Sequence, residues 1–304
     1  MCFRRVIRRT LQNINIEPYF LSEITKIQNN LIFYTKKNRH FAFFSISILM
    51  FIISVFILIL VLFTYIFYCF IAFLKPCNYR KGKGIVLIII AHPDDECMFF
   101  GPTILNLLRD ECEVYLLCLS AGGFYNKSKE RKKELRESCK LLGIPAGNVV
   151  IIEHSKLPDN PNSAWSPRKV AQIILKYVIQ LSVNIIVTFD EKGVSGHLNH
   201  VALNKGLSFL NSERLLPLDC EVLELKTVSL IQKYLSFLSV PLSVLHEKCY
   251  FISNRSETKI IQECMRAHKS QYVWFRKLYI IFSCYVYINQ YIHFNFSEEK
   301  CKNQ

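Results

Sequence analysis

The sequence predicts an α/β protein, built on a doubly wound, mostly parallel sheet with helices on both faces and preceded by one transmembrane helix. Three observations carry this prediction. Short apolar runs rich in β-branched residues alternate with amphipathic segments over residues 85–190, as parallel strands and their connecting helices do. Residues 41–74 form an unbroken uncharged stretch. Histidine or acidic residues directly follow two of the apolar runs, which is typical of ligand sites at strand ends.

Residues 41–74 are predicted to cross the membrane, because they exceed the roughly 20 apolar residues that one span needs. A cleaved signal peptide does not fit, since the block starts late and no small-residue cleavage site follows it. A buried core helix is disfavoured because the run has no polar face. Residues 1–40 are a basic N-terminal segment, and residues 75–84 have the composition of a linker. Basic residues flank the span evenly, so charge does not set its orientation.

The predicted strands and helices alternate after the linker. Proline at position 102 suits the first turn of a helix, and Gly143 suits the end of the next one. The predicted strands are 85–91, 113–120, 148–153 and 184–190, and the predicted helices are 102–110, 127–142 and 166–181.

Charge and cysteine content narrow the class of protein. The net charge of +14 suits an anionic lipid surface, a phosphorylated substrate or nucleic acid. Nucleic acid is disfavoured, because the sequence has no RNA-binding motif of aromatic and basic residues and no zinc-finger spacing. The 12 cysteines are scattered without a C-x-x-C pair. This pattern predicts reduced thiols that pack as small core residues in a cytosol-facing domain.

The stretch "IAHPDDECMFF" places His92, Asp94 and Asp95 at the end of the first predicted strand. Imidazole nitrogens and carboxylate oxygens are good ligands for zinc. His92 and Asp95 can converge on one ion while Asp94 faces an open coordination position. The alternative for so short a stretch is a solvated acidic turn.

A second cluster, "TFDEKGVSGHLNHVAL", follows the fourth predicted strand and contains Asp190, His197 and His200. Two such clusters at one sheet edge favour a shared metal site over two unrelated turns. A catalytic zinc ion takes three protein ligands and keeps one position open. His92, Asp95 and one histidine of the pair would meet that count, leaving the other histidine for acid–base or oxyanion chemistry.

The motifs "AHPDDECMFFGPT", "LLCLSAGGFYN", "ERKKEL", "LGIP", "VTFDEKGVSGHLNH" and "RKLYIIFS" closely resemble the N-acetylglucosaminyl-phosphatidylinositol de-N-acetylases, within the wider family of zinc-dependent sugar de-N-acetylases. The resemblance covers residues 85–296, which we therefore expect to be the catalytic domain, with 297–304 as a C-terminal tail. It implies a Rossmann-like fold, a site for Zn²⁺ or another divalent metal, and a single-pass protein of the endoplasmic reticulum membrane whose catalytic domain faces the cytosol.

The resemblance also implies roles for individual residues. His92, Asp95 and His200 match the metal ligands of the family. Asp94 matches the general base. His197 matches the histidine that stabilises the oxyanion or protonates the leaving group.

Asn199 departs from the bacterial relatives, which have an aspartate there, so the protonation state of His197 is the open question of this assignment. The remaining candidates are substrate-binding residues: Arg131, Asp190, His268 and Lys269. For Arg131 the alternative is a surface ion pair with a glutamate three residues further along.

The C-terminal segment allows two interpretations. Residues 265–279 fit either an edge that binds a headgroup or, as we favour, an amphipathic helix packed on the core, and their basic candidates are His268, Lys269, Arg276 and Lys277. Residues 274–296 are rich in aromatic side chains and fit either a core helix or a segment at a membrane interface.

The implied reaction removes acetate from N-acetylglucosaminyl-phosphatidylinositol and leaves glucosaminyl-phosphatidylinositol, in glycosylphosphatidylinositol anchor synthesis. The expected partners are this glycolipid and the membrane, with no nucleic acid. Two alternatives remain: a de-N-acetylase acting on another N-acetylglucosamine conjugate, and a catalytically silent membrane scaffold with the same fold.

Overall fold

The structure is a computed structural model, and it describes all residues except 1–17, 75–83, 161–162, 241–242, 245–248 and 295–304. The predicted linker, the C-terminal tail and the first part of the basic N-terminal segment lie outside the described residues. The chain divides into two compact units, residues 1–67 and 68–304.

Helix α2 spans Pro18–Leu74 and contains the predicted transmembrane stretch. It begins well before the uncharged run. Within it, Thr25–Tyr68 is a candidate membrane span by length and composition, with a mean hydropathy of 3.3 over its most apolar 18 residues. At 1.5 Å per residue, 57 helical residues extend about 86 Å, whereas the hydrocarbon core of a bilayer is about 30 Å thick. Only part of α2 therefore fits within a membrane.

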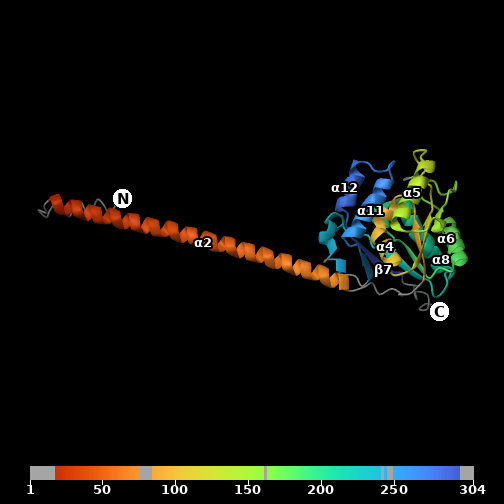
Figure 1. Cartoon of the computed structure of the whole chain (residues 1–304), viewed down its shortest axis with the longest axis horizontal. Coiled ribbons are helices and arrows are strands. Elements are labelled where there is room, and N and C mark those ends of the chain that lie inside the picture. The colour runs from red at the N-terminus through yellow and green to blue at the C-terminus, as the bar shows by residue number, and fades with distance from the viewer. Residues whose placement is uncertain (1–17, 75–83, 161–162, 241–242, 245–248, 295–304) are drawn as a thin grey trace, which may run out of the picture. The chain divides into compact units, whose positions relative to one another are not determined.

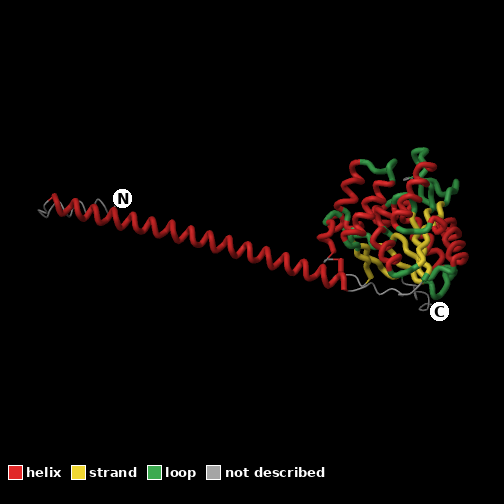
Figure 2. The backbone as a smooth tube through the Cα atoms, in the orientation of Figure 1, coloured by secondary structure: helices red, strands yellow, loops and turns green. Residues whose placement is uncertain are grey.

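The second unit is built on a seven-stranded sheet with the order β3-β2-β1-β4-β5-β7-β6. Figure 2 shows strands of this sheet in yellow among the red helices. The first five strands in this order are parallel, and β7 runs antiparallel to both of its neighbours, β5 and β6. The chain leaves β1 in one direction across the sheet and later adds β4 on the other side of β1. The carboxyl ends of β1 and β4 therefore form the switch point where ligands bind in doubly wound sheets.

The predicted α/β fold is confirmed, and each strand and helix predicted before residue 190 is present. The strands are β1 (Ile85–Ile90), β2 (Glu113–Cys118), β3 (Val149–Ile151), β4 (Ile185–Phe189), β5 (Glu221–Leu225), β6 (Cys249–Ile252) and β7 (Ile288–His293). The helices of this unit are α3 (Asp95–Phe99), α4 (Gly101–Arg109), α5 (Ser128–Leu142), α6 (Pro167–Leu181), α7 (Gly193–Gly196), α8 (Leu198–Ser212), α9 (Leu230–Lys233), α11 (Arg255–Ala267) and α12 (Trp274–Phe282), with short 3₁₀ turns η1 (Ala146–Asn148), η2 (Ser236–Ser239) and η3 (Cys284–Val286).

The helices form two groups around the sheet (Figure 1). Helices α4 and α5 make the crossovers from β1 to β2 and from β2 to β3, and α11 packs against both of them. Helices α6 and α8 make the crossovers that move the other way across the sheet, and they pack against each other. Because parallel crossovers are right-handed, the two groups cover opposite faces. The strands between them are almost fully buried.

The C-terminal segment differs from the prediction. Residues 265–279 are not one helix, since α11 ends at Ala267 and α12 begins at Trp274. Glu134 of α5 accepts hydrogen bonds from the amide and the hydroxyl of Ser270, both at 2.7 Å, which pins the turn between the two helices. Beyond α12 the chain forms β7, so the aromatic segment is a helix followed by a strand.

Six described cysteines are buried free thiols, as predicted, and they are Cys97, Cys118, Cys139, Cys220, Cys264 and Cys284. Cys112 is buried as well. Cys249 at the start of β6 is disulfide-bonded, contrary to the expectation.

Helices α6 and α8 approach closely at Gly206, where an added Cβ would lie 2.5 Å from Cγ1 of Val170 and 3.3 Å from the amide of Ala171. We expect Gly206→Ala to destabilise the domain by about 1–3 kcal/mol from overpacking, against a gain in helix propensity of at most about 1 kcal/mol. Gly147→Ala is the control, because nothing lies within 4 Å of its new methyl group. Denaturant unfolding of the detergent-solubilised chain measures both, and equal stabilities would contradict the close packing.

Candidate active site

The loop between β1 and α3 carries His92, Asp94 and Asp95 into a cavity of about 440 Å³ at the carboxyl end of the sheet. All three side chains are buried. Asp94 has a φ of +115°, a left-handed conformation that favours glycine and that aspartate and asparagine adopt more readily than other side chains. The solvated acidic turn is therefore wrong for this stretch.

Glu96 holds this strained loop in place. One carboxylate oxygen accepts the amide of Asp94 at 3.0 Å. The other accepts the hydroxyl of Ser138 on α5 and lies 2.6 Å from Nε2 of His268, which follows α11. Burial opposes the charge on Glu96, but its ion pair with His268 outweighs burial and brings its pKa below the ordinary value. The same pairing raises the pKa of His268 against the effect of burial.

His200 and Asp95 face each other in a way that requires a positive charge. Nδ1 of His200 lies 3.1 Å from the carbonyl of Gly193, so it carries a proton and donates to that oxygen. Its Nε2 has no hydrogen-bond partner among the described residues and lies 3.3 Å from Oδ1 of Asp95. Two lone pairs at this distance repel unless a proton or a metal ion lies between them. Burial alone would raise the pKa of Asp95. The nearby His200 and His92 have a larger and opposite effect, so the pKa lies well below its usual range.

His92 completes a set of donors that fits a divalent metal. Nitrogen atoms of His92, His197 and His200 lie within 4.8 Å of one another. Nε2 of His92 is 3.2 Å from Oδ1 of Asp159, so this nitrogen is the one that carries the proton and Nδ1 keeps its lone pair. Burial lowers the pKa of His92 well below its ordinary value, which keeps the ring neutral and able to coordinate.

His197 caps the first turn of α8. Its Nδ1 accepts the amide of Asn199 at 3.3 Å, so the neutral ring carries its proton on Nε2. Burial lowers the pKa of His197, and its side chain lines the cavity. The side-chain amide of Asn199 lies elsewhere, 3.0 Å from Nε2 of His92. The backbone of Asn199, rather than its side chain, thus orients His197.

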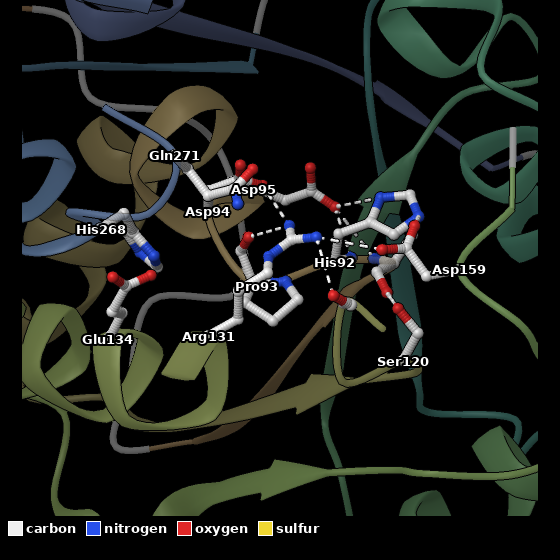
Figure 3. Close-up of polar contacts among 12 residues, drawn as sticks. His92, Pro93, Asp94, Asp95, Ser120, Arg131, Glu134, Asp159, His268 and Gln271 are labelled. Atoms are coloured by element: carbon white, nitrogen blue, oxygen red, sulfur yellow. Dashed lines mark hydrogen bonds and ion pairs between the residues drawn. The ribbon is translucent and has the colours of Figure 1, made fainter. Parts of the chain in front are cut away.

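Two arginines flank Asp94. An amino group of Arg276 lies 2.9 Å from Oδ2, and one of Arg131 lies 3.6 Å from Oδ1. Figure 3 shows the Arg131 guanidinium between Asp94 and Asp159, to which it is bonded at 3.0 Å. Burial raises the pKa of Asp94, and the two arginines oppose that rise without cancelling it. Asp94 is therefore a stronger base than its ordinary pKa would make it.

The other residues named from the sequence lie in different places. Arg131 is buried and also donates to the carbonyl of Pro93 at 2.7 Å, so it is not in the surface ion pair considered above. Asp190 accepts hydrogen bonds from the amide and hydroxyl of Thr227 at 2.7 and 2.6 Å and does not line the described cavity. His268 is fully buried against Glu96, and Lys269 is exposed outside this cavity.

Asp159 is a site residue that the sequence prediction missed, and Arg276 was named only as one of several basic candidates in residues 265–279. Asp159 contacts both His92 and Arg131 from the segment between β3 and α6. Trp165 of the same segment donates Nε1 to the carbonyl of Pro158 at 2.8 Å, and its ring centroid lies 6.1 Å from that of His92. Neither Asp159 nor Arg276 follows a strand, so strand-end position gave no indication of them.

A family model described as GlcNAc-PI de-N-acetylase matches residues 87–208. The N-acetylglucosaminyl-phosphatidylinositol de-N-acetylase of Bos taurus is 47% identical over 209 residues, which cover 68% of this chain and 83% of that protein. A probable enzyme of the same name from Dictyostelium discoideum is 34% identical over 240 residues, covering 69% and 93%. The N,N'-diacetylchitobiose deacetylase of Pyrococcus horikoshii, solved with its inhibitor, superposes with a TM-score of 0.51 at 17% identity, over 74% of this chain and 89% of that one.

The fold, the buried site and these relatives together define a deacetylase enzyme. More closely, the chain belongs to the GlcNAc-PI de-N-acetylase family.

We expect His268→Gln to destabilise the domain by about 3–5 kcal/mol, because it leaves the charge of Glu96 buried without its partner. The control is Glu263→Gln, which breaks an exposed ion pair with Arg266 on α11 and should cost less than about 1 kcal/mol. Unfolding of the solubilised chain compares the two, and a small loss at His268 would show that the pair does not hold the loop.

Proposed function

We propose that this protein hydrolyses the acetamide of N-acetylglucosaminyl-phosphatidylinositol and releases acetate and glucosaminyl-phosphatidylinositol. The observation that carries the proposal is the convergence of His92, Asp95 and His200 beside Asp94 and His197, in a chain of this family. The apolar helix α2 supports a membrane-bound enzyme acting on a lipid-linked substrate.

His92, Asp95 and His200 would hold the metal, since all three are buried and each has a lone pair or a charge directed into the site. Two imidazoles and one carboxylate are a usual donor set for catalytic zinc, which we assign as the ion. When bound, it would supply Lewis-acid activation of water and of the acetyl carbonyl.

The protein's own groups move the protons. Asp94 accepts a proton from the attacking water, helped by a raised pKa. His197 donates a hydrogen bond from Nε2 to the oxygen that becomes negatively charged. Asp94 then returns the proton to the glucosamine nitrogen as the C–N bond breaks, so that one water is consumed for each acetate released.

We assign the enzyme to the endoplasmic reticulum membrane, with its catalytic domain in the cytosol, from the family resemblance. Buried free thiols support the cytosolic side, where cysteines stay reduced. The disulfide at Cys249 is the one described feature that favours an oxidising compartment. Labelling of an added C-terminal tag in sealed microsomes shows whether the catalytic domain lies on the cytosolic or the lumenal side of the membrane, and an N-terminal tag reports the other end of the chain.

Incubation of the purified full chain with N-acetylglucosaminyl-phosphatidylinositol in vesicles should release acetate, and a chelator should abolish the release. Restored Zn²⁺ should recover it, because contacts within the protein, such as that of His200 with the carbonyl of Gly193, orient the donors. Acetate measured enzymatically is the readout. No release under metal-replete conditions would favour the scaffold alternative, and release from water-soluble N-acetylglucosamine conjugates alone would favour a different substrate.

Asp94→Asn should retain the metal but lower kcat by about 10²–10⁴-fold, the usual contribution of a general base. Asparagine tolerates the left-handed backbone of this position, so the loop should keep its shape. Metal content by atomic absorption, measured beside acetate release, separates loss of the base from loss of the site. Normal turnover at full metal content would exclude Asp94 as the base.

A further inference from the structure

The outer face of α12 exposes large apolar side chains although the helix lies beside the active site. Trp274, Phe275, Leu278, Ile281 and Phe282 are all exposed, with Trp274 at 72%, and their spacing places them along one side of the helix. Tyr279 and Ile280 are buried on the other side. A helix that is apolar on both sides needs a second apolar environment for the outer one.

The segment from α9 to η2 extends this face. Leu230, Ile231, Phe237 and Leu238 are exposed there, with Ile231 at 78%. The hydroxyl of Ser236 donates to the carbonyl of Ile281 at 3.3 Å, which places η2 beside α12. Both elements lie on the same side of the domain in Figure 1, and together their exposed apolar residues form what we call the apolar rim.

The apolar rim borders the active-site cavity. Tyr234, Phe275 and Tyr279 line the cavity together with His92 and Asp94, and the same three residues also line an adjoining apolar pocket. A molecule bound at the catalytic loop could thus continue along these aromatic side chains onto the rim.

Charge on the rim is of one sign. Segments 229–240 and 268–282 contain Lys233, Lys269, Arg276 and Lys277 and no aspartate or glutamate. Lys269 and Lys277 are exposed. Aromatic and aliphatic side chains bordered by lysine are the composition of surfaces that enter the interface of an anionic bilayer.

We propose that the apolar rim inserts into the headgroup–acyl boundary of the membrane. The headgroup of a lipid-linked substrate then enters the cavity while its acyl chains remain in the bilayer. The occupant of the rim is a lipid surface. The charge pattern favours it over a second copy of this chain, whose rim would bring lysines against lysines. The delivery step rests on the proposed function, whereas contact of the rim with lipid does not.

Trp274 gives a direct test, because the chain has only two tryptophans and the other, Trp165, is 2% exposed. The full chain is reconstituted into vesicles of phosphatidylcholine and phosphatidylserine, with and without brominated acyl chains. We expect brominated lipid to quench the emission of the natural protein, and to leave the emission of Trp274→Phe, which retains Trp165, almost unchanged.

Two outcomes overturn the contact. Quenching of Trp274 by aqueous acrylamide but not by brominated lipid would place the rim in water. Shielding of Trp274 from both quenchers would mean that protein, such as a second copy of the chain, covers it.

Delivery is tested with a charge on the rim. Ile231→Glu should lower kcat/KM by about tenfold or more for N-acetylglucosaminyl-phosphatidylinositol in vesicles, because burial of one large apolar side chain is worth at least that factor. The same variant should leave kcat/KM unchanged for the headgroup without acyl chains. Leu218→Glu is the matched control, a fully exposed leucine before β5, at the opposite end of the sheet from the site.

Equal losses on both substrates, or an equal loss in Leu218→Glu, would overturn delivery through the rim. If the natural protein shows lipid quenching but releases no acetate from either substrate, the proposed function fails and the membrane contact stands. If it releases acetate while Trp274 remains unquenched by lipid, the rim proposal fails alone.

Discussion

The buried ion pair between Glu96 and His268 is the constraint on which the active site depends. Through Glu96, three separate parts of the chain meet: the loop after β1, helix α5 at Ser138, and the turn after α11. Removing two charges from water costs several kcal/mol each, and an apolar pair of the same volume would often be more stable. What the pair provides is a fixed geometry, because it keeps Asp94 in a left-handed backbone conformation that would otherwise relax.

Two adjacent carboxylates are given opposite properties by their surroundings. Asp95 faces His92 and His200, so its pKa falls and it stays an anion that can bind a cation. Burial raises the pKa of Asp94 by more than Arg276 and Arg131 lower it, so the net shift is upward and Asp94 can take up a proton. This separation of neighbouring acids is the usual way in which one site obtains both a permanent charge and a base.

Much of this arrangement could be predicted from the sequence, because it depends on local pattern. The apolar runs of β1 to β4 are continuous and buried, and His92 and Asp95 directly follow the first of them. β7 was not predicted, since its polar sequence becomes a strand only through antiparallel pairing with β5 and β6. Asp159 was missed for a similar reason, because tertiary packing alone brings it to the site. The same packing selects Arg276, from the basic candidates of residues 265–279, as the one beside Asp94. The roles of the site residues themselves stay predictions.

The indole of Trp165 has a consequence for studying this protein. It packs about 6 Å from the His92 ring and is fastened to the backbone of the segment that carries Asp159. Emission from an indole is sensitive to the charge and orientation of a nearby imidazole, so the molecule contains an intrinsic optical reporter at its reactive centre. Ion uptake and inhibitor arrival can therefore be followed in real time in unlabelled enzyme, with Trp274 replaced by phenylalanine to remove its background.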